Sequence, residues 1–484
     1  RFKNVQEDVY DLLLNYKILL NNSVYNKSEN VVNESRRIKF ELAFLRSKLQ
    51  SGNLNVSKIE EIENGINIRE RELYNLKIDS IIGLKANEIS VNNMKKDEAF
   101  LEFIKYKKYG VNMERDTDQY YGVIIYNSSI VSPIIIDLGK IDCSLSKSIN
   151  VRENISLNYG DNSKSNYHYL FEKIWKPVSI YLSGVKKLYY SPIGTISELN
   201  LGAIKLSKNC YLMDSFELIN QVVRNLTLIE ETDFKMKNNN ALILGGLNYD
   251  YSDSIKNKEN WPYGIAEVSV HNTRGKSNQW MYLPGTKEEA ENIHRKLLNS
   301  GFESNLWCEG MATEFNFKQQ CKKEYSPIII HIATHAFYLS ESNEALHPLM
   351  KSGLILAGAN SAWSSNVAIT GSDNGILTSY EIAQLNLSST ELVILSACNS
   401  GIGDIKGSEG IYGLQRAFKI AGVKYIIMSL WPVPDKATNE LMTLFYEFWM
   451  EDKHNIRTAL TKAQKQIRIK YPDPYYWAGF ELVE

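Results

Sequence analysis

Two stretches decide the fold of this chain: Ser326-Pro-Ile-Ile-Ile-His-Ile-Ala-Thr-His-Ala-Phe337 and Glu391-Leu-Val-Ile-Leu-Ser-Ala-Cys-Asn-Ser-Gly401. Each is a β-branched, apolar run that ends at a reactive side chain, His335 in the first and Cys398 in the second. Such runs are typical of parallel strands that are buried on both faces. In open α/β sheets, chemistry collects just beyond the carboxyl ends of the strands. We therefore predict a mainly parallel α/β sheet that brings an imidazole and a thiol to one edge, provided that the two strands are neighbours.

A thiol beside an imidazole is the arrangement that a cysteine nucleophile with an adjacent base requires. The pKa of a thiol falls next to a histidine or where backbone N–H groups converge, and the loop after a strand can offer both. A lone cysteine after an apolar strand is more simply interpreted as a buried hydrophobic residue. The second strand end, at His335, shifts the balance towards a cysteine peptidase with His335 as the base and Cys398 as the nucleophile.

Two other histidines compete with His335 for the role of base. His331 lies inside the apolar run, which favours a hydrogen-bonded histidine in the core, and His347 falls on a predicted loop. His331 and His335 are four residues apart, as in helical metal sites, but Pro327 and the isoleucine run disfavour a helix. No acid stands between them as in H-E-x-x-H, so the sequence predicts no metal site.

Two further roles are assigned by position. The backbone N–H groups of Ala336 and Cys398 are the natural donors for an oxyanion. Asp435 follows Leu430-Trp-Pro-Val-Pro434 at another predicted strand end. It is interpreted either as a helix cap or first-turn acid, or as the carboxylate of a substrate pocket for Arg or Lys.

Composition excludes several classes of function. The 484 residues contain 55 Lys and Arg against 56 Asp and Glu, so charge gives no argument for nucleic acid or an acidic membrane as partner. No apolar run reaches the ~18 residues of a membrane span. Five scattered cysteines without C-x-x-C spacing favour a reducing cytosol. The glycine-rich loop at 401–407 lacks the G-x-G-x-x-G and G-K-[ST] spacings, so no cofactor is expected and a helix is predicted to start at 408–410.

Three segments are predicted along the chain. Residues 1–85 form a helical hairpin or the end of a helical-repeat region, and residues 86–235 form a non-catalytic α/β layer. Its strands are expected at 99–104, 120–126, 131–136 and 187–190, and its helix at 169–182. Residues 236–484 form the catalytic α/β domain.

Within the catalytic segment, strands are predicted at 241–246 and 423–431 and helices at 436–449 and 455–468. Thr286 and Glu289 form a capping-box pattern at the start of another helix. The expected inner face of that helix consists of Ala290, Ile293, Leu297 and Leu298.

Several motifs in this order resemble the CHAT domain, a family of caspase-like and separase-like cysteine peptidases that is often coupled to tetratricopeptide repeats. The similarity covers 241–484 and, more loosely, the chain from residue 97. The motifs are His331-Ile-Ala-Thr-His-Ala336, Leu395-Ser-Ala-Cys-Asn-Ser-Gly401, Glu409-Gly-Ile-Tyr-Gly-Leu-Gln-Arg-Ala-Phe418, Ser429-Leu-Trp-Pro-Val-Pro-Asp435, Leu283-Pro-Gly-Thr286 and Tyr475-Tyr-Trp-Ala-Gly-Phe480.

The resemblance implies a caspase-like α/β/α sandwich with His335 and Cys398 as the catalytic dyad, preceded by a pseudo-caspase layer. Ala336 departs from the Gly that many members of the clan have after the histidine, but the backbone N–H is retained. The family's members commonly act in bacterial defence or regulated proteolysis, and they cut a dedicated protein partner after activation. The expectation is therefore a cytoplasmic cysteine endopeptidase with a protein substrate and an activating protein or complex. The alternative is a catalytically silent caspase-like scaffold that binds protein partners.

Overall fold

The computed structural model describes most of the chain after residue 93. The described residues are 94–106, 120–127, 133–141, 169–207, 210–221, 238–252, 279–321, 326–338, 348–350, 352–364, 373–396, 404–405, 411–452 and 455–484, with the isolated positions Arg69, Ile155 and Tyr159. Apart from Arg69, the predicted N-terminal helical segment lies outside them.

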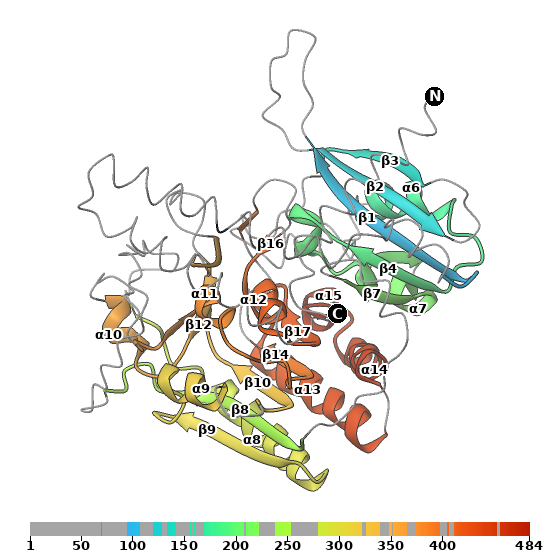
Figure 1. Ribbon diagram of the computed structural model, residues 1–484. Helices are drawn as coiled ribbons and strands as arrows, with labels where there is room; N and C mark the ends of the chain where they lie inside the picture. Colours follow the sequence, from blue (N-terminus) through green and yellow to red (C-terminus); the bar gives the residue numbers. More distant parts are fainter. Residues whose placement is uncertain are drawn as a thin grey trace, which may run out of the picture.

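One eleven-stranded sheet dominates the described part of the chain, in the order β3-β2-β1-β4-β7-β18-β17-β14-β10-β8-β9 (Figure 1). Its strands are β1 (Glu98–Tyr106), β2 (Tyr120–Asn127), β3 (Ile134–Gly139), β4 (Lys187–Ser191), β7 (Glu217–Asn220), β8 (Asn240–Leu247), β9 (Glu303–Glu309), β10 (Ile329–Ala333), β14 (Leu392–Ser396), β17 (Tyr425–Ser429) and β18 (Phe480–Val483). Neighbours are parallel except at β1–β2, β2–β3 and β17–β18. The predicted mainly parallel α/β class is confirmed.

The central strands are buried on both faces. Every residue of β10 and of β14 is buried, as the uninterrupted apolar runs predict. β8 is likewise buried from Ala241 onwards. This part of the sheet therefore needs helices on both sides.

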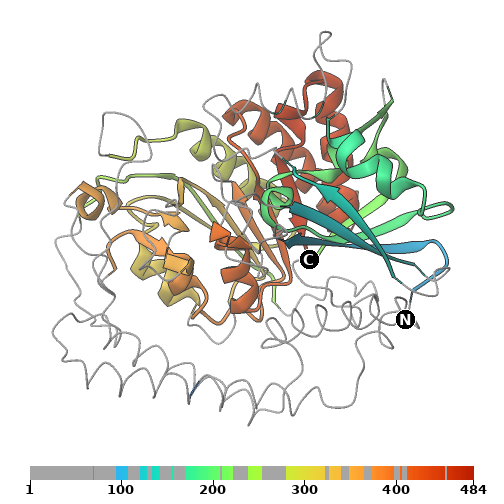
Figure 2. The same ribbon diagram turned by 90° about the horizontal axis from the view of Figure 1, so that it is seen from above.

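Helices supply those two outer layers. They are α6 (Lys176–Ser179), α7 (Leu212–Ser215), α8 (Pro284–Asn299), α9 (Glu314–Cys321), α10 (Ala359–Ser364), α11 (Ser379–Ile382), α12 (Leu414–Ala421), α13 (Asp435–Tyr446), α14 (Ile456–Lys470) and α15 (Pro474–Trp477). Short 3₁₀ turns occur at η2 (Gly194–Glu198), η3 (Leu201–Ala203) and η5 (Pro348–Met350), and π-helical turns at η1 (Phe171–Trp175) and η6 (Glu447–Glu451). In Figure 2, α8, α13 and α14 cover one face of the sheet, and α9, α11 and α12 cover the other. The arrangement is a three-layer α/β/α sandwich.

The start of α8 differs from the prediction. The helix begins at Pro284, whose ring fixes φ at a helical value, so Leu283 rather than Thr286 is the N-cap. Thr286 instead bonds the carbonyl of Leu283 at 2.7 Å and accepts the N–H of Gly246 at 3.0 Å. The predicted capping box is therefore wrong.

The inner face of α8 is confirmed for three of its four predicted residues. Ala290, Ile293 and Leu297 are fully buried, but Leu298 is 48% exposed. The helix after the glycine-rich loop also starts later than predicted. Residues 411–412 belong to a strand, and α12 begins at Leu414.

Three smaller sheets complete the described structure: β11-β12-β13 (Ala336–Tyr338, Ser352–Ile355, Ile376–Thr378), β15-β16 (Asp404–Ile405, Ile411–Tyr412) and β5-β6 (Lys205–Ser207, Cys210–Tyr211). The sheet of β11, β12 and β13, called the small sheet below, receives the chain directly from β10.

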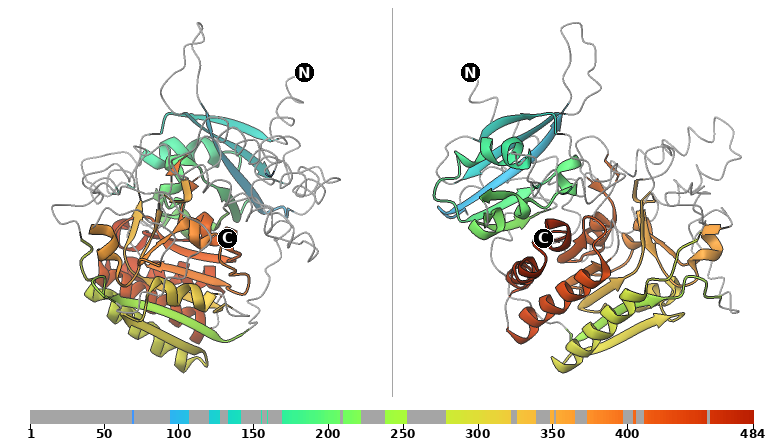
Figure 3. Two further views of the ribbon diagram at one scale, coloured as in Figure 1. Left: turned by 60° about the vertical axis from the view of Figure 1, so that its left-hand side comes forward. Right: turned by 180° about the vertical axis from the view of Figure 1, so that it is seen from behind.

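The last strand, β18, lies in the middle of the large sheet and joins its two halves. β18 pairs with β17 in antiparallel fashion and with β7 in parallel fashion, and the Glu484 N–H donates to the carbonyl of Asn220 at 2.9 Å. Figure 3 shows the C-terminus between the part of the chain before residue 221 and the part after residue 238. The large sheet therefore includes strands from both predicted α/β segments, 86–235 and 236–484. No helix among the described residues is long and apolar enough to span a bilayer.

Candidate active site

The two strands that lead to the predicted dyad are neighbours. β10 and β14 run parallel in register from Ile329 opposite Leu392 to Ala333 opposite Ser396. His335 and Cys398 each follow two residues after that last pair. Cys398 itself lies outside the described residues. The adjacency of the strands, on which the predicted dyad depends, is confirmed.

His335 lies where the chain leaves the large sheet. β10 ends at Ala333, and the next strand, β11, begins at Ala336 in the small sheet. Thr334 fixes the crossing, because its hydroxyl donates to the carbonyl of Ile355 at 2.5 Å. The carbonyl of His335 accepts the Ile355 N–H at 2.9 Å. The imidazole is therefore carried on a backbone that is hydrogen-bonded on both sides of the crossing.

The ring of His335 has a defined orientation. Its Nε2 lies 2.8 Å from the carbonyl oxygen of Met281. A carbonyl can only accept, so Nε2 carries the proton and the lone pair of the neutral ring is on Nδ1. Only 6% of the residue is exposed, and the rings of Trp280 and Tyr249 lie 4.9 and 5.2 Å from the imidazole centroid.

Asn360 holds the segment that orients the imidazole. Its amide oxygen accepts the Trp280 N–H at 2.7 Å, and its amide nitrogen donates to the Trp280 carbonyl at 3.1 Å and to Asp250 at 2.8 Å. The segment from Trp280 to Met281 is thus tied to the loop after β8. These residues were not predicted, since no local pattern in the sequence links them to a histidine some fifty residues away.

His331 has a different environment from His335. It is fully buried; its Nε2 lies 3.0 Å from Glu289 and its Nδ1 lies 3.4 Å from the hydroxyl of Tyr446. The other carboxylate oxygen of Glu289 accepts from the hydroxyl of Ser396 at 3.1 Å. The interpretation of His331 as a hydrogen-bonded core residue is confirmed, and Glu289 links the middle of β10 to the last residue of β14.

Asp435 is the first residue of α13, which follows β17 at the same edge of the sheet. Its carboxylate packs on Gly285, where an added Cβ would come within 2.5 Å of Oδ2. Burial, and then the negative charge of Glu289, raise the pKa of this carboxyl above its ordinary value. Gly285 and Met281 are four residues apart, so at most about 14 Å of chain separates the contact with Asp435 from the contact with His335. The placement as a first-turn acid is confirmed; the pocket role stays a prediction.

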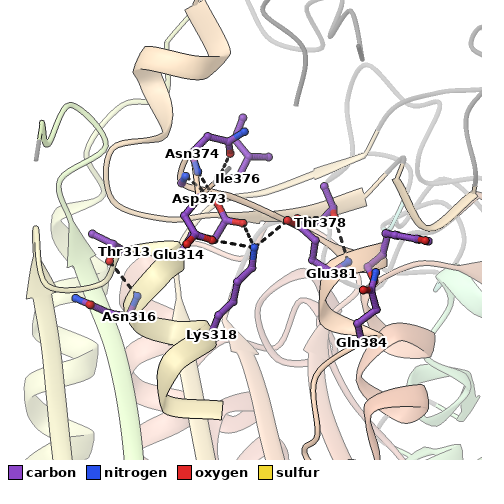
Figure 4. A network of polar contacts seen from close by, with 12 residues as sticks. Thr313, Glu314, Asn316, Lys318, Asp373, Asn374, Ile376, Thr378, Glu381 and Gln384 are labelled. Carbon is purple, nitrogen blue, oxygen red and sulfur yellow. Dashed lines mark hydrogen bonds and ion pairs between the residues drawn. The ribbon is translucent and has the colours of Figure 1, made fainter. Parts of the chain in front are cut away.

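A buried ion cluster anchors the small sheet to the body of the molecule (Figure 4). The ammonium of Lys318, on α9, lies 2.5 Å from Glu314, 3.0 Å from Asp373 and 2.9 Å from Glu381. Burial alone lowers the pKa of Lys318, but the carboxylates of Glu314 and Glu381 outweigh it and raise that pKa.

The ion cluster also binds backbone at both ends of β13. Glu314 accepts the N–H groups of Asn374 at 2.8 Å and Gly375 at 3.0 Å, just before the strand. Glu381 accepts the N–H of Thr378, the last residue of the strand, at 2.9 Å. The small sheet that receives His335 and Ala336 is thereby fixed to α9.

The other described cysteines lack the features of a nucleophile. Cys321 is buried, and burial raises the pKa of its thiol to about 12. Cys308 is half-buried, and burial raises the pKa of its thiol as well. Cys210 is also half-buried. Cys143 and the third histidine candidate, His347, lie outside the described residues, among which no group of three or more His, Cys, Asp or Glu side chains could hold a metal ion.

Part of this chain is similar to two curated proteins. Tetratricopeptide repeat protein 28 of Mus musculus is 31% identical over 110 residues, which are 22% of this chain and 4% of the mouse protein. The Homo sapiens protein of the same name is 30% identical over 110 residues, with the same shares. The matched region is therefore a small part of these relatives' length.

Two solved structures are among those to which this chain is similar. Gingipain R, described as an Arg-specific cysteine proteinase, has a TM-score of 0.39 and 11% identity over 69% of each chain. The Saccharomyces cerevisiae separase–securin complex has a TM-score of 0.43 and 7% identity over 95% of this chain and 34% of that chain. The family model of the CHAT domain matches residues 166–483. Since this match covers more than half of the sequence, the chain belongs to the CHAT domain family.

Proposed function

We propose that this protein is a cysteine endopeptidase that cuts a protein partner through His335 and Cys398. The observation that carries the proposal is the register of β10 and β14, which pairs Ala333 with Ser396 two residues before each reactive side chain. Membership of the CHAT family supports the same chemistry.

In the proposed reaction, the Nδ1 of His335 takes the proton of the Cys398 thiol, because Nε2–H is held by the carbonyl of Met281. The thiolate attacks the carbonyl carbon of the scissile peptide, and a thioester forms when His335 returns the proton to the leaving amine. Water activated by His335 then hydrolyses the thioester, which releases the acid and restores the thiol.

The backbone of Ala336 supports the role of oxyanion donor. Ala336 is opposite Leu354, and the Ile355 N–H donates to the carbonyl of His335, so Ala336 occupies a non-hydrogen-bonded pair of the antiparallel ladder. Its N–H therefore points away from β12. β11 is an edge strand of the small sheet, which leaves this donor for a developing oxyanion beside Cys398.

Asp435 is proposed to select Arg or Lys before the cleaved bond. A carboxylate with a second negative group, Glu289, nearby favours a cation in its vicinity. Replacing Asp435 with Ala should lower kcat/KM for Arg and Lys peptides and leave that for a norleucine peptide within about twofold, which is the size of an indirect effect. Glu440→Ala, further along α13, is the control. Equal losses on all three peptides would remove the assignment.

The dyad is tested by covalent labelling with a peptide that carries an electrophilic ketone after Arg. We expect labelling of the wild type after activation, none of Cys398→Ala, and wild-type labelling of Cys308→Ala, which removes a half-buried thiol on β9. Mapping of cleavage sites by mass spectrometry, in proteins encoded beside this one, then compares the wild type with Cys398→Ala. Cleavage that survives in Cys398→Ala would refute the dyad, and a chain that binds those proteins without cutting or being labelled would be the silent scaffold.

Regulation by an activating protein or complex is part of the proposal, as is a role in bacterial defence or signalling. The support is the resemblance to the CHAT family and the position of His335 at the crossing between two sheets. A partner that binds the small sheet would act on the backbone next to this imidazole.

A further inference from the structure

Two aromatic rings contact the imidazole of His335. The indole of Trp280 lies 4.9 Å from the imidazole and the phenol of Tyr249 lies 5.2 Å from it, both measured between ring centroids. The two rings are inclined to the imidazole by 42° and 47°, between stacked and edge-to-face arrangements. Both distances are within the ~6 Å over which an aromatic face attracts a cation.

One buried residue, Asn360, fixes the backbone of both aromatic residues. Its N–H donates to the carbonyl of Tyr249 at 3.0 Å, and its side-chain amide bonds the N–H and the carbonyl of Trp280. The hydroxyl of Tyr249 lies 3.0 Å from that of Thr334, which precedes His335 in the chain. The two rings are therefore fixed relative to the backbone that carries the imidazole.

The indole of Trp280 has an unsatisfied donor. Its Nε1 is buried and has no hydrogen-bond acceptor among the described residues. A buried donor without an acceptor is destabilising, and a phenylalanine at this position would avoid that cost. An indole is, however, the ring whose face attracts a cation most strongly. The residue type at position 280 therefore fits contact with a cation better than it fits simple packing.

His335 becomes a cation in the proposed reaction, when its Nδ1 takes the proton of the Cys398 thiol. The residue is buried, so water gives the imidazolium little hydration. The carbonyl of Met281, which accepts from Nε2, supplies one favourable dipole. The ring faces beside the imidazole supply further favourable electrostatics.

Other titratable groups also surround this end of the large sheet. Among the described residues, the side chains that face it are Tyr249, Asp250, Tyr282, Glu289 and Asp435. Asp250 accepts from the side-chain amide of Asn360, and Glu289 bonds His331. None of these acids is altered in the ring variants below, so a changed titration of His335 in those variants is due to the rings.

We propose that Trp280 and Tyr249 are positioning residues that stabilise the imidazolium form of His335 through their ring faces. The proton leaves the sulfur of Cys398 and is held on Nδ1, and the rings stabilise the resulting pair of imidazolium and thiolate. The role in catalysis rests on the proposed dyad, whereas the effect of the rings on the imidazole can be measured without catalysis.

That effect is tested by NMR titration of the full chain carrying Cys398→Ala, with the His335 signal assigned from His335→Gln. Trp280→Leu should lower the midpoint of the titration by about 1 pH unit, and Trp280→Phe should lower it by less, because a phenyl face attracts a cation less strongly. A ring that only shields the imidazole would have the opposite effect, because its removal admits water and raises the midpoint.

Two further comparisons separate the rings from their surroundings. Tyr249→Leu should lower the midpoint, whereas Tyr249→Phe, which keeps the ring and loses the bond to Thr334, should not. Trp363→Leu is the matched control, since it removes a tryptophan that contacts Trp280 at 4.8 Å, and it should leave the midpoint unchanged.

A midpoint that stays or rises in Trp280→Leu, or that falls equally in Trp363→Leu, would overturn the proposal. If Trp280→Leu does not fold, the direction of the change in Trp280→Phe decides in the same way. In the chain that retains Cys398, Trp280→Leu should also slow labelling by the peptide ketone about tenfold at neutral pH. A wild type that is never labelled would refute the dyad but not the effect of the rings on the imidazole, so the two failures are distinguishable.

Discussion

The large sheet has two junctions that differ in how they hold a buried acid. Between β10 and β14 the ladder runs over five pairs, and both oxygens of Glu289 are bonded, one to His331 and one to Ser396. Between β7 and β18 the ladder has one pair, and the buried carboxyl of Glu481 interacts with the hydroxyl of Tyr190 and with the side chain of Asn220.

The difference shows what a buried carboxylate does in each place. Glu289 joins the middle of β10 to the last residue of β14, so its bonds serve the geometry of the candidate dyad. Glu481 lies where β7 and β18 separate, and burial raises its pKa to about 7. A fully bonded acid indicates a positioning role, whereas a buried acid with a raised pKa makes stability depend on pH.

The largest effect on peptide cleavage is expected from replacing His335, which follows the paired strands β10 and β14. His335→Gln removes the proposed base, and we expect kcat/KM for peptide cleavage to fall by about 10²–10⁴. His294→Gln, on α8, is the control: this half-buried histidine bonds Ser304 at 2.8 Å and should leave cleavage unchanged. A folded His331→Gln variant that loses more activity than His335→Gln would reverse the assignment of the base.

At the junction of β7 and β18, the buried acid Glu481 should make the free energy of unfolding depend on pH. Burial raises the pKa of Glu481 from 4.5 to about 7, so the folded protein binds a proton in this interval that the unfolded chain has released. Stability should therefore fall as pH rises from about 4.5 to about 7, by up to about 3 kcal/mol in total.

Glu481→Gln should remove this part of the pH dependence, so that the variant gains on the wild type as pH rises. Urea unfolding at pH 5 and pH 8 measures the difference, with Glu440→Gln as the exposed control. A wild type and a Glu481→Gln variant with parallel pH profiles would show that the acid is satisfied in solution.

A smaller effect is expected from Glu289→Gln. The amide keeps the shape but faces one of the two donors, His331 or Ser396, with an N–H group, and we expect a loss of about 2 kcal/mol in the free energy of unfolding. Peptide cleavage should fall with it, because β10 and β14 lose the group that joins them. Glu291→Gln, on the same helix, should change neither unfolding nor cleavage, and a variant of Glu289 that behaves like it would remove the positioning role.

The sequence predicted what depends on local pattern. The apolar runs before His335 and Cys398 predicted the buried parallel strands, and the alternation of strands and helices predicted the class of sheet. The inner face of α8 was predicted at Ala290, Ile293 and Leu297 but not at Leu298, which lies at the border of the apolar stripe near the end of the helix.

What could not be predicted depends on contacts between distant segments. The sequence predicted that Glu289 completes a capping box, but its carboxylate bonds His331 on β10. The helix itself starts at Pro284, two residues before Thr286. Met281 and Asn360 have no sequence signal at all. The position of β18 between β17 and β7 is equally non-local, and it joins the two halves of the large sheet.

The crossing of the chain at Thr334 has a consequence for control of the proposed reaction. β10 is fixed in the large sheet, whereas Ala336 begins a strand of the small sheet. A tilt of the small sheet relative to the large one would therefore move the Ala336 N–H with respect to the end of β14, and it would strain the contacts that hold the imidazole to Met281 and Trp280. A protein that binds only the small sheet could thereby change the proposed oxyanion donor and the proposed base together, without touching the peptide to be cut.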